Sequence, residues 1–192
     1  MSPHDYYFFS LPFQTFQAKL PEIFAEVNKD KPPTSVNIWG VDLAPGSPPT
    51  AKEAIVLYKF LKARNMVLAD AQTMLLATLK WRQEFDIDAV RAESFPEDVF
   101  GKLGVVAGKD KDGRPVTYNL YSEAKGPKNA EVFGDVKRFI RWRVQLMERG
   151  IELLDFETIG DMVQVHGTFS PSFSCLGALR RTSFDAVQLS IE

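Results

Sequence analysis

Cysteine and histidine are nearly absent from this chain. Its single cysteine, Cys175, cannot form an internal disulfide, and its two histidines, His4 and His166, lie too far apart to complete a zinc site with it. No nucleophile–base–acid set can be assembled from these residues, and no carboxylate pair lies within an apolar run. We therefore expect a protein that is not an enzyme.

The chain also lacks an excess of charge of either sign and a long apolar run. The formal net charge is −2, so no broad basic field favours nucleic acid as a partner. No apolar run approaches the roughly 18 residues of a spanning helix. The N-terminal MSPHDYYFFSLPFQTF has no basic segment of the kind that opens a signal peptide. Any membrane contact should be peripheral.

Residues 104–110, GVVAGKD, partly match a phosphate-binding loop. That motif needs glycine where Leu103 stands and serine or threonine, to hold magnesium, where Asp110 stands. The mismatch at both positions argues against nucleotide cleavage.

Two helices are expected near the middle of the N-terminal half. Thr50 and Glu53 form the pattern of a capping box, and an apolar face follows them up to a stop at Asn65. A second helix is expected over residues 68–85, with Asp70 in its first turn. The short connection makes the two helices an antiparallel hairpin.

A sheet is expected in the second half. We expect two strands joined by a turn, at residues 103–107 and 116–121. A long helix is expected at residues 132–154 and another strand at residues 162–166. This β-β-α-β order predicts an α/β fold with a mixed sheet and a crossover helix.

These elements suggest four segments. Residues 1–49 are an N-terminal extension with one helix over 14–28, broken or entered at its proline. Residues 50–95 are a helical domain, 96–166 the first part of a sheet domain, and 167–192 a serine-rich tail without firm periodicity.

Arg143 is the first candidate site residue. It lies one turn from Phe139 and near Leu146 on the long helix, so it should point toward the apolar side. A buried arginine needs an anionic partner, which is either a carboxylate of this chain or a ligand carboxylate or phosphate. The wet stripe of the same helix is expected to comprise Lys137, Arg141, Gln145, Glu148 and Glu152.

His166 ends an apolar strand and is either a hydrogen-bonded core histidine or a donor in a pocket. In the expected strand over 116–121, Tyr118 and Tyr121 fall on opposite faces. Only one of the two tyrosines should therefore face a pocket.

The sequence carries a family resemblance over roughly residues 10–166. KFLKAR followed by TLKWRQEF, and GKDKDGRPV followed by an alternating strand, resemble the helical start and the sheet entry of CRAL-TRIO lipid-binding proteins. AKLPEIFAEV, IWGVDL, FGDVKRFIRWRVQLME and MVQVH are similar to the fungal non-classical phosphatidylinositol transfer proteins, a group with haem-binding members.

The resemblance implies an α/β protein with a helical N-terminal domain and an incomplete CRAL-TRIO sheet. It implies a monomeric cytoplasmic carrier of phosphatidylinositol or another phospholipid between membranes, docking transiently and peripherally on the endoplasmic reticulum. The rival functions are a ligand-sensing or membrane-recruitment module that exchanges nothing, and a non-functional truncated product.

The haem-binding group implies haem b as a cofactor. Its histidine at the iron matches His166, but its axial tyrosine, two residues later, falls on Thr168 here, which leaves no metal ligand to assign. Tyr121 and Arg143 are further candidate haem contacts by position. The likeness ends directly after His166, so we expect the chain to be truncated at its C-terminus by a shifted reading frame, a retained intron or a mis-predicted exon.

Overall fold

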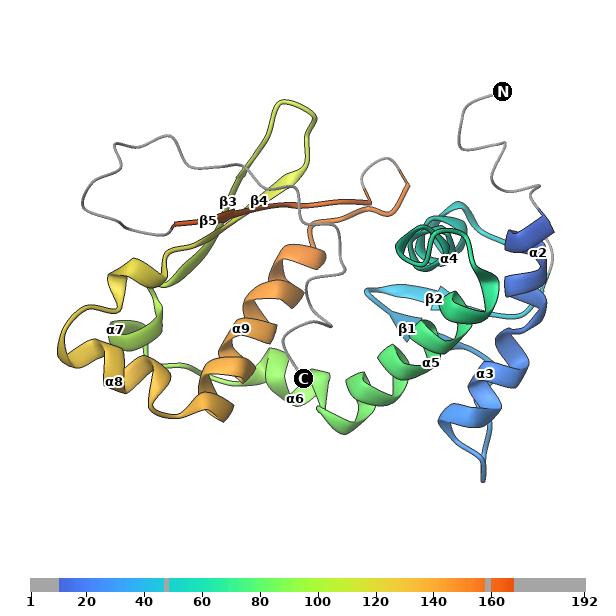
Figure 1. The fold of residues 1–192 in the computed structure, drawn as a ribbon, viewed down its shortest axis with the longest axis horizontal. Coiled ribbons are helices and arrows are strands. Elements are labelled where there is room, and N and C mark those ends of the chain that lie inside the picture. The colour runs from blue at the N-terminus through green and yellow to red at the C-terminus, as the bar shows by residue number, and fades with distance from the viewer. Residues whose placement is uncertain (1–10, 47–48, 158–159, 168–192) are drawn as a thin grey trace. The chain divides into compact units, whose positions relative to one another are not determined.

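The computed structural model describes residues 11–46, 49–157 and 160–167. It divides into two compact units (Figure 1). Unit 1 comprises Met1–Asp86 and Asp155–Gly160, and unit 2 comprises Ile87–Leu154 and Asp161–Glu192. Among the described residues, no helix is both long enough and apolar enough to cross a membrane.

Unit 1 contains four helices in its described part: α2 (Leu11–Ala18), α3 (Leu20–Val27), α4 (Ala51–Ala63) and α5 (Leu68–Glu84). The helix expected over 14–28 is two helices, and the expected break or entry point at Pro21 is confirmed, because the chain breaks at Lys19 and Pro21 lies in the first turn of α3. Proline lacks the N–H that a continuous helix would need and suits a helix start. The helix hairpin of α4 and α5 is confirmed.

The capping box at the start of α4 is confirmed and extends further than predicted. The Thr50 hydroxyl accepts from the Glu53 amide at 3.2 Å, and Glu53 Oε2 accepts from the Thr50 amide at 2.9 Å. The second oxygen, Oε1, accepts from the Ala44 amide at 2.9 Å. Buried Glu53 therefore ties the start of α4 to the end of the preceding strand.

A small hairpin of β1 (Val36–Ile38) and β2 (Val41–Leu43) completes unit 1. Trp39 at its turn stacks on Phe60 of α4 and on Phe156, with ring centroids 5.6 and 6.2 Å apart. Phe156 belongs to the returning segment and is buried. Phe156 is thus part of the core of unit 1 although it lies about 70 residues after α5 in the sequence.

The described part of unit 2 is a three-stranded sheet with helices. Strands β3 (Gly104–Lys109) and β4 (Pro115–Asn119) are antiparallel, and β5 (Val163–His166) lies parallel to β4 at the other edge. The remaining elements are α6 (Ile87–Ala92), α7 (Glu97–Phe100), a short 3₁₀ turn (η1, Tyr121–Glu123), α8 (Pro127–Phe133) and α9 (Val136–Ile151). The mixed sheet and its helical crossover are confirmed.

Two predicted elements of unit 2 were too long. The single helix over 132–154 is in fact α8 and α9, because the Asp135 carboxylate accepts from the Arg138 amide at 3.0 Å and caps a new helix. The strand over 116–121 ends at Asn119, and Tyr121 begins the 3₁₀ turn. Tyr121 is therefore not placed by strand alternation.

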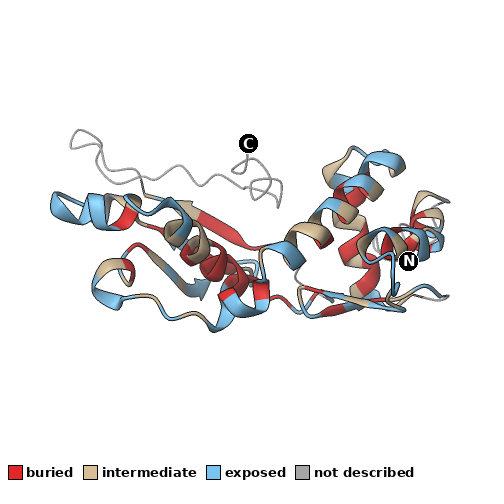
Figure 2. Ribbon diagram, turned by 90° about the horizontal axis from the view of Figure 1, so that it is seen from below, coloured by how far each residue is buried: buried red, intermediate tan, exposed pale blue. Residues whose placement is uncertain are grey.

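Helix α9 lies on one face of the sheet at close range (Figure 1). A Cβ at Gly104 would stand 2.2 Å from Leu146 Cδ2, and one at Gly150 would stand 3.0 Å from Thr117 Cγ2. Glycine at both positions lets the helix approach the strands. Buried residues, red in Figure 2, accordingly lie on α9 and on β4.

Candidate functional site

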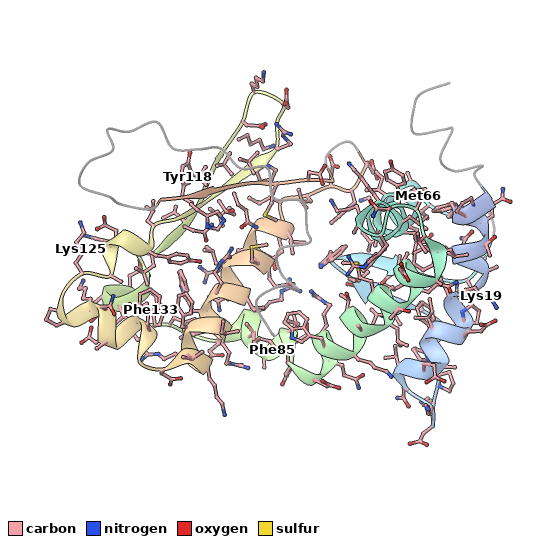
Figure 3. The ribbon with its side chains drawn as sticks, viewed as in Figure 1. Lys19, Met66, Phe85, Tyr118, Lys125 and Phe133 are labelled. Atoms are coloured by element: carbon pink, nitrogen blue, oxygen red, sulfur yellow. The ribbon has the colours of Figure 1, made fainter. Side chains whose placement is uncertain are left out.

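The two faces of the unit 2 sheet differ in chemistry. The register places a polar row on the face that α9 covers, made of Thr117, Asn119, Gln164 and His166. The opposite face is mainly apolar and carries Val105, Val116, Tyr118, Val163 and Val165. Tyr118, labelled in Figure 3, is 37% exposed there. We call the four polar residues together with Arg143 the polar cluster.

Arg143 reaches from α9 to the polar row and meets no carboxylate there. Its Nη2 donates to Gln164 Oε1 at 3.0 Å, while Gln164 Nε2 lies 3.0 Å from Met147 Sδ. Its Nη1 is buried and has no hydrogen-bond partner among the described residues. The alternative of pairing with a carboxylate of this chain therefore does not hold within those residues, and the guanidinium keeps an unused donor.

Asn119 is the fully buried member of the cluster with no partner. Neither its amide oxygen nor its amide nitrogen has a hydrogen bond to any described residue. Thr117, two residues earlier on the same face, donates its hydroxyl to the Val163 carbonyl at 3.3 Å. No sequence signal pointed to Asn119, because an isolated asparagine in a strand carries no motif.

His166 is paired with Asn119 across the two parallel strands. Its ring is exposed, so the alternative of a core histidine is wrong. Partial desolvation, and then the positive charge of Arg143, hold the pKa of His166 below its usual 6.5. The imidazole is therefore neutral at pH 7 and can act as donor, acceptor or ligand.

The predicted wet stripe of α9 was wrong at two positions. Gln145 and Glu148 are buried. The Gln145 amide donates to the carbonyls of Val90 and Glu93 at 2.9 and 2.6 Å, and Arg141 pairs with the Glu93 carboxylate at 2.6 Å. This side of α9 is covered by α6 and the segment after it.

Tyr121 lies in an aromatic cluster with edge-to-face contacts. Its ring centroid is 6.5 Å from Phe133, labelled in Figure 3, and 5.8 Å from Phe139. The structure thus brings Arg143 and His166 together, and it places Tyr121 against aromatic side chains. Thr168 and Cys175 lie outside the described residues.

No family model matches the chain. Patellin-6 of Arabidopsis thaliana is 37% identical over 168 residues, covering 84% of this chain and 40% of that protein. The phosphatidylinositol transfer protein SFH5 of Cryptococcus neoformans is 38% identical over 154 residues, covering 77% of this chain and 49% of that protein. The chain is homologous to patellins and SFH5 phosphatidylinositol transfer proteins.

The fold is that of a solved relative. The crystal structure of Sfh5 matches with a TM-score of 0.67 and 27% identity, over 81% of this chain and 55% of that one. The α/β fold inferred from the resemblance is confirmed. The chain spans 40% and 49% of the lengths of Patellin-6 and SFH5. The haem-binding group, the truncation and the four-segment division stay predictions.

Proposed function

We propose that this chain is part of a carrier of phosphatidylinositol or a related phospholipid, and that it is not an enzyme. The observation that carries the proposal is Nη1 of Arg143, which is buried beside neutral polar groups and has no hydrogen-bond partner among the described residues. A guanidinium in such a place lacks the anion that normally compensates it. A lipid phosphate supplies that anion, and the similarity to proteins named for phosphatidylinositol transfer supports this choice.

The test is binding and transfer of phosphatidylinositol by the 192-residue chain. Vesicles that contain the labelled lipid are mixed with acceptor vesicles, and the lipid held by the re-isolated protein is measured by mass spectrometry. Arg143→Met should lower the bound lipid about tenfold or more, because charged hydrogen bonds contribute about 1.5–3 kcal/mol. Arg149→Met is the matched control, since Arg149 is exposed on the same helix. Equal loss in both variants would contradict the proposal.

The same experiment separates the carrier from its rivals. A ligand-sensing or membrane-recruitment module would bind the lipid or the vesicle and transfer nothing. A non-functional truncated product would show no cooperative thermal unfolding. We place the carrier in the cytoplasm as a monomer that visits the endoplasmic reticulum peripherally, and fractionation of cells with sizing of the protein tests that placement.

Haem b is a second proposed ligand of the same cluster. The guanidinium of Arg143 fits a haem propionate, and the neutral imidazole of His166 can face the iron. Tyr121 is retained as a further contact, although its ring packs against Phe133 and Phe139. When bound, haem would supply an iron centre, with no axial oxygen assigned from the described residues. Absence of a Soret band after haem titration would contradict this.

A further inference from the structure

Within the part of the chain that the structure describes, neither the donor nor the acceptor of the Asn119 amide has a hydrogen-bond partner. A buried donor or acceptor without a partner costs about 1–3 kcal/mol, and Asn119 has both within a fully buried side chain. Such a group in a folded protein requires an explanation. Asn119 lies on the central strand β4, between Gly104 and His166 in the register. It is therefore a member of the polar cluster and not a surface residue.

The chemistry of the amide restricts what can satisfy it. The oxygen accepts and the nitrogen donates, so an anion, which only accepts, would leave the oxygen unpaired. A hydroxyl group both donates and accepts and can satisfy both atoms. The partner that fits Asn119 is therefore a hydroxyl, in contrast to the anion that fits Arg143.

The guanidinium of Arg143 and the amide of Asn119 lie close together in the fold. Gln164, which holds Arg143 Nη2, is paired with Thr117, two residues from Asn119 on the same face. Diagonal neighbours on one face of a sheet lie about 7–8 Å apart, within the span of a small headgroup. The cluster thus presents a cationic donor and a neutral amide side by side.

We propose that Asn119 binds a hydroxyl group of a polyol phosphate headgroup whose phosphate is bound by Arg143. This assignment rests on the proposed lipid-binding function and adds a residue that selects among anionic lipids. Phosphatidic acid offers the phosphate alone, whereas phosphatidylinositol offers the phosphate with a ring of hydroxyls. Asn119 should therefore favour phosphatidylinositol.

The test compares two short-chain probes, dihexanoyl phosphatidylinositol and dihexanoyl phosphatidic acid, by calorimetric titration of the 192-residue chain. Asn119→Leu should weaken phosphatidylinositol binding about tenfold and change phosphatidic acid binding less than about twofold. Arg143→Met should weaken both probes. Asn119→Ser keeps a group that donates and accepts, and it should retain part of the preference.

Thermal unfolding without ligand gives an independent readout. Asn119→Leu replaces the unpaired amide by an apolar group of similar size, so its melting temperature should rise while its phosphatidylinositol binding falls. If the leucine does not fit, Asn119→Ala adds no atoms and provides the same binding comparison.

Three outcomes overturn the assignment. Unchanged phosphatidylinositol binding in the Asn119 variants would show that the amide is satisfied by a buried water, while the carrier function would stand. Equal affinity of the wild-type chain for both probes would show that Asn119 does not select phosphatidylinositol, while the carrier function would again stand. If the wild-type chain binds neither probe, the proposed function itself is wrong, and so is the role of Asn119.

Discussion

Replacing Gly104 by alanine should destabilise unit 2 by forcing α9 away from the sheet. The new Cβ would stand 2.2 Å from Leu146 Cδ2 and 3.1 Å from two ring atoms of Trp142. Unstrained carbon atoms stand about 3.5–4.0 Å apart. Both neighbours are buried, so neither can turn into solvent. The helix or its side chains must therefore move.

The expected loss combines two opposing terms. Overpacking of a filled core costs about 1–3 kcal/mol. The smaller conformational freedom of alanine in the unfolded chain returns about 0.4–1 kcal/mol. The net destabilisation of Gly104→Ala is then about 1–2 kcal/mol, which lowers the melting temperature by roughly 4–8 °C per kcal/mol in a unit of this size.

Differential scanning calorimetry of the full chain measures this shift. Val105→Ala is the matched control, because Val105 is the next residue, faces away from α9 and is 40% exposed. It should cost less than about 1 kcal/mol. The cost of Gly104→Ala should become smaller in a Leu146→Ala background, which removes the 2.2 Å contact and leaves the two contacts at 3.1 Å with Trp142. An unchanged melting temperature, or simple additivity with Leu146→Ala, would refute the packing argument.

Three further changes test other parts of the structure. Glu53→Ala should cost about 2–4 kcal/mol in urea unfolding, because it removes the two hydrogen bonds that the carboxylate accepts from the Thr50 and Ala44 amides, whereas Thr50→Ala should cost about 1 kcal/mol. Arg143→Met should raise the pKa of His166 toward its usual value in an NMR titration, because one of the two causes of the lowered pKa is removed. An unchanged pKa would show that the charge of Arg143 does not act on the imidazole of His166. The Arg114 side chain donates to Asp110 and lowers the pKa of that carboxyl, so its stabilisation is present above pH 3.8 and is lost as pH falls through the lowered value. Asp110→Asn should therefore be less stable than the wild type at neutral pH and converge with it in acid, as measured by unfolding at a series of pH values.

The elements with local signals were predictable from sequence. The capping box of Thr50 and Glu53 is read from side chains three residues apart, and the valine-rich strands from their alternation. The break at Asp135 was missed, because the apolar residues on both sides of it fit one continuous helix. Asparagine or aspartate caps are visible only when the pattern around them also stops.

The site was predictable only where charge and burial conflict. Arg143 was identified because an arginine on the apolar side of a helix needs an anion, and no described residue supplies a partner for its buried Nη1. Asn119 did not stand out, since its unpaired state depends on the pairing of β4 with β5, across more than forty intervening residues. Gln145 and Glu148 were misplaced for a related reason, because helix periodicity does not report what a distant segment covers.

The stacking of Trp39 on Phe156 has a consequence for synthesis of the protein on the ribosome. The first stretch of unit 1 ends at Asp86, but its core also contains Phe156 from the segment Asp155–Gly160, and Lys59 donates to the Gly160 carbonyl at 2.6 Å. About 70 further residues must be translated before that segment leaves the exit tunnel, which takes several seconds at roughly 5–20 residues per second. During that interval the nascent hairpin exposes one face of its tryptophan, and the whole of unit 2 up to the end of α9 emerges first.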